Sequence, residues 1–171
     1  MDGGWFSTTG VDPTVLLRLK ETYDGAEPAA SSVAALNLLA LSHLTGDPAM
    51  AERAERTLAL FRAHLGRAVP MMLAALSTYH AGMPQIVVAG DAEAADTRAL
   101  LRAARGVYRP STLVVPAFTG HRAALSRVLP WVEDMGMRDG RATAYVCRDF
   151  ACQSPVQTAE ALTAQLAARD L

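Results

Sequence analysis

The sequence predicts a mixed α and α/β fold, with a helical first half and a small α/β second half. Apolar residues follow helical spacing between positions 33 and 65. After position 83, two short runs rich in β-branched residues, QIVVAGD and STLVVPAF, alternate with helical stretches. Strands that alternate with helices favour a small, partly parallel sheet whose first pair is joined by a right-handed crossover. We therefore expect two segments, residues 1–83 and residues 84–171.

Three helices are predicted in the first segment. The first covers Val33–Leu44 and ends at Gly46. The second has Asp47 as its N-cap and Pro48 in its first turn, and the third covers Pro70–His80. Short turns between them predict a helical hairpin followed by one more helix.

The first predicted helix is apolar around most of its circumference, so it needs neighbours on several sides. Only two other helices are predicted in this segment to cover it. Some of its leucines should therefore remain accessible and form a surface for self-association or for a protein partner. The candidates are Leu36, Leu38, Leu39 and Leu41.

The second segment begins with the predicted strand QIVVAGD and a helix whose acidic residues come early and whose arginines come late. STLVVPAF predicts a second strand. Pro130 should kink or restart the next helical stretch, HRAALSRVLPWVEDM. RATAYVCRDFACQSPV predicts a third extended run, and Thr158–Ala168 a last helix.

Charge and hydropathy exclude several partner classes. Sixteen Lys and Arg residues against seventeen Asp and Glu residues give a formal charge of −1, which favours neither nucleic acid nor an anionic membrane as partner. The start MDGGWFSTTG lacks a basic and apolar leader pattern. Apolar runs fall short of the ~18 residues that a membrane span requires. A soluble, cytoplasmic protein is expected.

An acidic and aromatic cluster precedes the first helix in ETYDGAEPAASSVAAL. Glycosidic chemistry uses two carboxyl groups about 5 to 9.5 Å apart, and sugar sites often add an aromatic platform. Tyr23, Asp24 and Glu27 fit this pattern, together with Trp5 near the start of the chain. A structural interpretation competes with it. Asp24 before Gly25 is a common turn pair, Glu27 suits a helix N-terminus, and both aromatic residues can simply pack.

Cys147 and Cys152 frame the stretch CRDFAC, which has neither the spacing of a thioredoxin motif nor that of a zinc clip. Along one extended strand the two would lie about 16 Å apart, whereas a disulfide needs Cα atoms within about 7 Å. They can pair only if Arg148–Ala151 makes a turn. We therefore expect two buried free thiols in a reducing compartment, and no redox pair.

Metal and nucleotide sites are not predicted. The four histidines, at positions 43, 64, 80 and 121, are scattered and give no metal-binding spacing. The lone glycine of VVAGD falls far short of a dinucleotide fingerprint. We therefore expect no cofactor, and no complete catalytic constellation identifies the chain as an enzyme.

Four stretches in this order resemble the C-terminal part of the spermatogenesis-associated protein 20 family: GGWF, LKETYDGAEPAASSVAALNLLALSHLTGD, QIVVAGD and GRATAYVCRDFACQSPV. Members of that family have an N-terminal thioredoxin-like domain followed by an (α/α) toroid of the six-hairpin glycosidase and N-acylglucosamine 2-epimerase kind. The resemblance implies that residues 1–83 are a helical hairpin portion of such a toroid. The family commonly has Pro-Ser-Gly-Asn-Ser where this chain has Pro-Ala-Ala-Ser-Ser, so the Asn amide is missing, although Ser31 or Ser32 can still cap the helix.

Two functions follow from the resemblance. A chain without the thioredoxin-like domain and most toroid hairpins lacks the walls of a central pocket. This implies a non-catalytic module, whether a fragment, a split gene product or a truncated paralogue, that associates with a partner or with itself. The alternative is a carbohydrate-binding or carbohydrate-modifying protein in which Tyr23, Asp24 and Glu27 face the centre of a helical ring.

Overall fold

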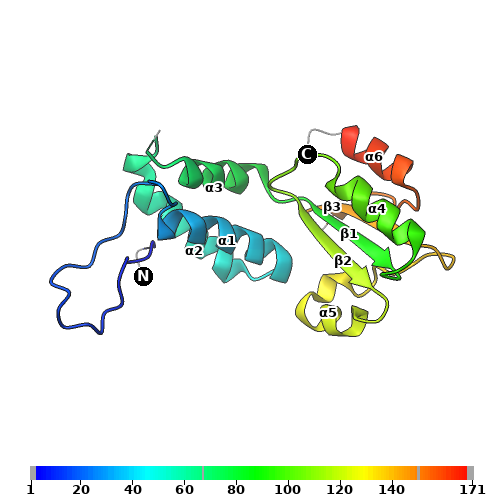
Figure 1. Cartoon of the computed structure of the whole chain (residues 1–171), viewed down its shortest axis with the longest axis horizontal. Helices are drawn as coiled ribbons and strands as arrows, with labels where there is room; N and C mark the ends of the chain where they lie inside the picture. The colour runs from blue at the N-terminus through cyan, green and yellow to red at the C-terminus, as the bar shows by residue number, and fades with distance from the viewer. Residues whose placement is uncertain (1–2, 67, 150, 169–171) are drawn as a thin grey trace. The chain divides into compact units, whose positions relative to one another are not determined.

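The structure, a computed structural model, describes residues 3–66, 68–149 and 151–168. The chain divides into two compact units, Met1–Ala81 and Gly82–Leu171. Within the described residues, the first unit holds three α-helices, and the second holds three more together with a four-stranded sheet (Figure 1). The mixed α and α/β class with a partly parallel sheet, predicted from the sequence, is confirmed.

The helices of the first unit start and stop where local sequence signals place them. They are α1 (Ala30–Thr45), α2 (Pro48–Phe61), the short 3-10 helix η1 (Arg62–His64) and α3 (Pro70–Ala81). Gly46 ends α1 in a left-handed conformation with φ 72°, which glycine adopts without steric cost. Asp47 then caps α2 by accepting a hydrogen bond of 2.9 Å from the backbone N–H of Ala49.

The core of the first unit lies where α1 packs against both α2 and α3. Each of these helices contributes a fully buried alanine, Ala35, Ala54 or Ala75, and small side chains let helix backbones approach closely. Leu39 and Met72 are buried as well. Burial of a side chain of that size stabilises the fold by about 1.5–3 kcal/mol.

A long segment ahead of α1 forms neither helix nor strand over residues 3–29 (Figure 1). Its two arms are joined where the backbone N–H of Ser7 donates to the carbonyl oxygen of Leu19 at 2.8 Å. It is held to α1 where the backbone N–H of Trp5 donates to Ser31 Oγ at 2.9 Å. Thus the hydroxyl of Ser31 binds the incoming chain and does not cap its own helix.

The second unit is built on a sheet with strand order β2-β1-β3-β4. The central strand β1 pairs in parallel with β2 and antiparallel with β3, and β4 pairs antiparallel with β3. Both strands predicted from the apolar runs are confirmed. The bounds are β1 (Gln85–Gly90), β2 (Leu113–Phe118), β3 (Thr143–Arg148) and β4 (Ala151–Cys152).

Two helices, α4 (Ala95–Arg105) and α6 (Ala159–Ala167), lie side by side over the sheet in Figure 1. They share an apolar core with β1 and β3, in which Ile86, Val88, Leu100, Val146 and Leu162 are all buried. The alternation of Ile86 and Val88 on β1 places both on the helix-covered face, as the period of two in a strand requires.

The third helix of this unit, α5 (Arg122–Val128), contacts β2. Leu129 follows it, and Pro130 begins a separate 3-10 helix, η2 (Pro130–Val132). Proline lacks the backbone N–H that continues a helix, so the predicted restart at this residue is confirmed.

A carboxylate joins the start of α4 to the start of β3. Asp96 accepts hydrogen bonds from the backbone N–H of Thr97 at 2.8 Å and of Ala142 at 2.9 Å. The bonds from Ala142 and Thr97 hold the pKa of Asp96 below its ordinary value, against the opposing effect of burial, with Arg141 assisting by its charge. Asp96 therefore ties two elements that lie 46 residues apart in sequence.

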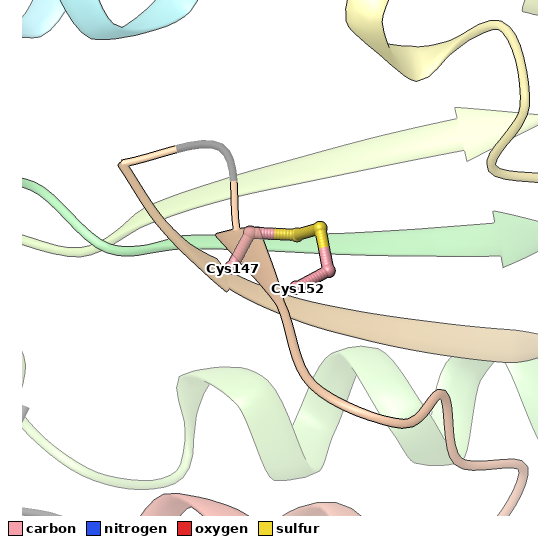
Figure 2. The surroundings of a disulfide bond; sticks show 2 residues. All are labelled: Cys147 and Cys152. Carbon is pink, nitrogen blue, oxygen red and sulfur yellow. A yellow bond between two sulfur atoms is a disulfide. The ribbon is translucent and has the colours of Figure 1, made fainter.

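The hairpin of β3 and β4 carries a disulfide (Figure 2). Cys147 and Cys152 stand opposite one another in the antiparallel register, with Cα atoms 4.0 Å apart and sulfur atoms 2.07 Å apart. The prediction of two free buried thiols is therefore wrong. The chain reverses direction after Arg148, with Asp149 at φ 48°, so the strand geometry that would separate the cysteines does not apply. Phe150, inside the same stretch, lies outside the described residues.

Candidate functional site

The four residues proposed from the sequence as a ligand site do not form one cluster. Asp24 is buried, whereas Tyr23 is 63% exposed and Glu27 is exposed. Trp5 is half-buried and lines a different depression of the first unit. Each of these positions therefore has its own role.

Asp24 holds the N-terminal ends of two helices. Its Oδ1 accepts a hydrogen bond from the backbone N–H of Ala29, the N-cap of α1, at 2.8 Å. Its Oδ2 accepts one from Met71, in the first turn of α3, at 2.9 Å. Backbone N–H groups at a helix start have no partner within the helix, so an anion there satisfies them and interacts well with the helix dipole. The capping expected from Ser31 or Ser32 is thus supplied by Asp24.

The environment of Asp24 keeps its carboxylate charged. Burial raises its pKa, but hydrogen bonds from the backbone of Ala29, Met71 and Met72, with the nearby Ser32 hydroxyl assisting, outweigh burial and hold the pKa below its ordinary value. The Ser32 hydroxyl lies close to the carboxylate, although outside regular hydrogen-bond geometry. A general acid in glycosidic chemistry needs a raised pKa, so Asp24 is unsuited to that role.

A surface depression of about 470 Å³ is formed by the loop that surrounds Asp24. Glu21, Tyr23 and Glu27 line it, but Asp24 does not. The carboxylate pair beside the tyrosine is therefore Glu21 with Glu27. Glu21 was missed in the sequence analysis, although Glu21 and Tyr23, two residues apart in an extended segment, belong to the same side of the chain.

A larger depression, of about 730 Å³, lies between residues 3–9 and α2. Four basic residues line it, from sequence positions up to 38 residues apart, so no local motif signals the cluster. The four are Arg18, Lys20, Arg53 and Arg56. Trp5, Phe6 and four hydroxyl-bearing residues complete its polar and aromatic wall. Of the described residues that line it, none is acidic.

The apolar surface of the first unit is only partly the predicted one. Some of four leucines were expected to remain accessible: Leu41 is 43% exposed, Leu36 and Leu38 are half-buried, and Leu39 belongs to the core at 2% exposure. Leu39 therefore cannot contribute to an interaction surface.

Within the first unit, the most exposed apolar side chains lie instead in residues 11–19. Leu16 is 98% exposed and Leu17 72%, with Val11 and Leu19 also exposed. The sequence VDPTVLLRL held a usable signal, because it places five apolar residues within nine positions that belong to no predicted helix or strand.

Neither a metal centre nor a membrane span is found in the part of the chain that the structure describes. Across residues 3–66, 68–149 and 151–168, no three His, Cys, Asp or Glu side chains come together as a potential metal site. None of the helices in these ranges has the length and apolar character needed to cross a bilayer.

Sequence comparisons relate the chain to one part of much longer proteins. Spermatogenesis-associated protein 20 of Homo sapiens is 38% identical over 158 residues, which are 90% of this chain and 20% of the human protein. The protein of the same name from Rattus norvegicus shows the same identity and coverage. An uncharacterised protein of Caenorhabditis elegans is 28% identical over 169 residues, 93% of this chain and 22% of that protein.

The resemblance to spermatogenesis-associated protein 20 inferred from the four sequence stretches is thereby confirmed for this region. The chain spans about one fifth of the length of the curated relatives it matches. No family model matches the chain, and no solved structure matches it significantly.

Proposed function

We propose that the chain is a non-catalytic module that docks onto a protein partner through the apolar segment of residues 11–19. The observation that carries the proposal is the exposure of two adjacent leucines, Leu16 at 98% and Leu17 at 72%. Burial of each CH₂ group contributes about 0.8 kcal/mol, so burial of both exposed leucines at an interface would contribute substantially to the free energy of binding. Clustered exposed apolar side chains commonly mark an interaction site.

The partner we propose is further polypeptide of a protein similar to spermatogenesis-associated protein 20. With 20% of the human relative aligned, about four fifths of that protein has no counterpart in this chain. The (α/α) toroid and thioredoxin-like domain implied by the family resemblance would supply this polypeptide. Helical hairpins pack through apolar ridges, which suits the exposed leucines and the exposed Leu41 of α1.

The test compares the chain alone with the chain mixed with the complementary part of the human relative, by analytical ultracentrifugation. We expect the mixture to form a complex that the double variant L16S/L17S loses. The matched control is Tyr108→Ser, which also removes an exposed apolar side chain (90% exposed) but in the second unit. Both variants should unfold at the same temperature as the wild type, because neither side chain is buried.

Two outcomes would contradict the proposal. The first is a wild-type chain that remains a monomer and binds no part of the relative. The second is a complex that L16S/L17S forms as well as the Tyr108→Ser control. Concentration-dependent association of the chain alone, abolished by L16S/L17S, would replace the proposed partner with a second copy of the same chain.

Carbohydrate binding is the second candidate, favoured by the depression that brings Glu21 and Glu27 beside the exposed ring of Tyr23. Carboxylates accept hydrogen bonds from sugar hydroxyls, and an aromatic face packs against a sugar ring. Titration with neutral oligosaccharides, followed by calorimetry, tests it. Under this hypothesis, Tyr23→Ala abolishes the heat of binding and Tyr79→Ala, an exposed tyrosine outside this depression, does not.

A further inference from the structure

We infer that the basic depression between residues 3–9 and α2 binds a small soluble phosphate ester. Its volume of about 730 Å³ falls within the range of small-molecule sites, about 300–1,000 Å³. Its described lining carries four positive charges and no negative one. This concentration of charge on one concave surface contrasts with the whole chain, whose formal charge is −1.

Backbone geometry builds this depression. The backbone N–H of Gly4 donates to Thr57 Oγ1 at 3.1 Å, which fixes the incoming segment on α2. Gly3 and Gly4 both have positive φ, 74° and 69°. A Cβ atom on Gly3 would lie 2.4 Å from the carbonyl oxygen of Arg56, so only glycine allows this approach. The depression is therefore formed by the close packing of two segments that are distant in sequence.

Two of the cations are held in place on one wall. The guanidinium of Arg18 lies 4.1 Å from the ring centroid of Phe6 and donates to the carbonyl oxygen of Thr8 at 3.2 Å. The ammonium of Lys20 lies 5.0 Å from the same centroid and also donates to the carbonyl oxygen of Gly3. Cation–π contacts leave the positive charge uncompensated, so both groups keep their attraction for an anion.

Helix α2 supplies arginines without strong partners. Among the described residues, the guanidinium of Arg53 has neither an ion pair nor a hydrogen bond. Arg56 pairs with Glu52 at 3.5 Å, but both side chains are about half exposed or more, and such surface pairs contribute little. Both guanidinium groups are therefore available to a ligand.

The chemistry of the lining selects a phosphate. Guanidinium groups donate paired N–H bonds that match the oxygens of a phosphate, and several of them neutralise its double charge. Ser7, Thr8 and Thr9 add hydroxyl donors. Trp5 lies in the same lining and offers an aromatic surface to the organic part of the ester.

The test is isothermal titration of the full chain with inorganic phosphate, phenyl phosphate and, as a neutral control, benzyl alcohol. We expect phenyl phosphate to bind best, inorganic phosphate less well and benzyl alcohol not at all. Added salt should weaken the binding, because the attraction is between charges. Arg53→Gln should reduce the association constant about tenfold or more, as expected for loss of a charged hydrogen bond.

Arg53→Gln is suited to the test because its side chain has no partner to lose in the fold. The matched control is Arg62→Gln, an exposed arginine outside the depression, which should bind like the wild type. Three outcomes would overturn the inference: no heat with phenyl phosphate at millimolar concentration, equal loss in both variants, or co-sedimentation with phosphatidic acid vesicles that phenyl phosphate does not displace. The L16S/L17S variant retains all four basic residues, so failure of the docking proposal leaves this test intact.

Discussion

The backbone N–H of Met71 donates a hydrogen bond of 2.9 Å to the carboxylate of Asp24, 47 residues earlier in the chain. The same carboxylate accepts the N–H of Ala29. One side chain thus fixes the start of α3 relative to the start of α1. Asp24, a candidate ligand-binding residue from the sequence, therefore holds the starts of two helices in place.

Removal of the Asp24 carboxylate should destabilise the first unit. Asp24→Ala leaves buried N–H groups at two helix starts without partners, and we expect a loss of about 2–4 kcal/mol in the free energy of unfolding. Asp24→Asn keeps one carbonyl oxygen and should lose less. Urea denaturation followed by far-UV circular dichroism measures both. The exposed Glu27→Gln is the control, expected within about 0.5 kcal/mol of wild type. Equal stability of Asp24→Ala and this control would refute the capping role.

Stability should fall in acid because of Asp24 and Asp96. Both carboxyl groups have a folded-state pKa below the ordinary value of 3.8, so between the folded and unfolded pKa the unfolded chain binds more protons. The contribution of the two carboxyl groups to the stability of the fold is complete above their unfolded-state pKa. It is lost as pH falls through their folded-state pKa. Thermal unfolding from pH 7 to pH 2.5 should show the midpoint decreasing below about pH 4.

Variants identify which group causes the acid sensitivity. The decrease should be shallower in Asp24→Asn and in Asp96→Asn, since each variant removes one carboxyl group whose pKa is lowered in the folded chain. An acid transition unchanged in both Asp variants would show that other groups control it.

Much of the fold follows from local signals, and the exceptions have identifiable causes. The α2 start at Asp47–Pro48 and the strand β1 were both predicted, because capping chemistry and apolar patterning act over a few residues. The role of Asp24 was not predicted, since its partner Met71 belongs to a helix that is distant in sequence. The basic depression was missed for the same reason: Arg18 and Arg53 meet only after the chain folds.

The cysteine pair shows a different cause of error. The spacing of Cys147 and Cys152 was measured along one strand, whereas the chain turns between them and places them in register. The sequence condition for pairing, a turn within Arg148–Ala151, is met in the structure. The turn has no glycine or proline to signal it, and Asp149 takes the left-handed conformation in their place.

Loss of the disulfide should destabilise the second unit by a modest amount. The bond closes a loop with a sequence separation of only 5, for which chain entropy gives about 2 kcal/mol. We expect the double variant C147S/C152S, and the wild type under a thiol reductant, to lose about that free energy of unfolding while keeping the sheet. Thiol titration before and after reduction counts the cysteine thiols that the disulfide holds in oxidised form. A fully reduced chain as stable as the oxidised one would contradict this.

The prediction that this pair is not a redox couple remains to be tested by equilibration with thiol buffers. Cys147 is buried and Cys152 is exposed, so attack by an external thiolate should occur at Cys152. A pair reduced at potentials typical of thioredoxin would refute the prediction. A bond that persists under those conditions would support a structural role.

Gly90 and Thr97 should be strongly coupled in stability. A Cβ atom on Gly90, at the end of β1, would lie 2.1 Å from Thr97 Oγ1 and 3.0 Å from its Cγ2. Thr97 is fully buried in α4, at 0% exposure. We therefore expect Gly90→Ala to cost more than about 2 kcal/mol in the free energy of unfolding, as overpacking in a tight core does.

Thr97→Ala removes both clashing atoms, so the double variant should recover much of that loss. A double-mutant cycle by urea denaturation measures the coupling. Simple additivity of the two single losses would show that the strand and helix separate freely at this point, against the close packing seen here.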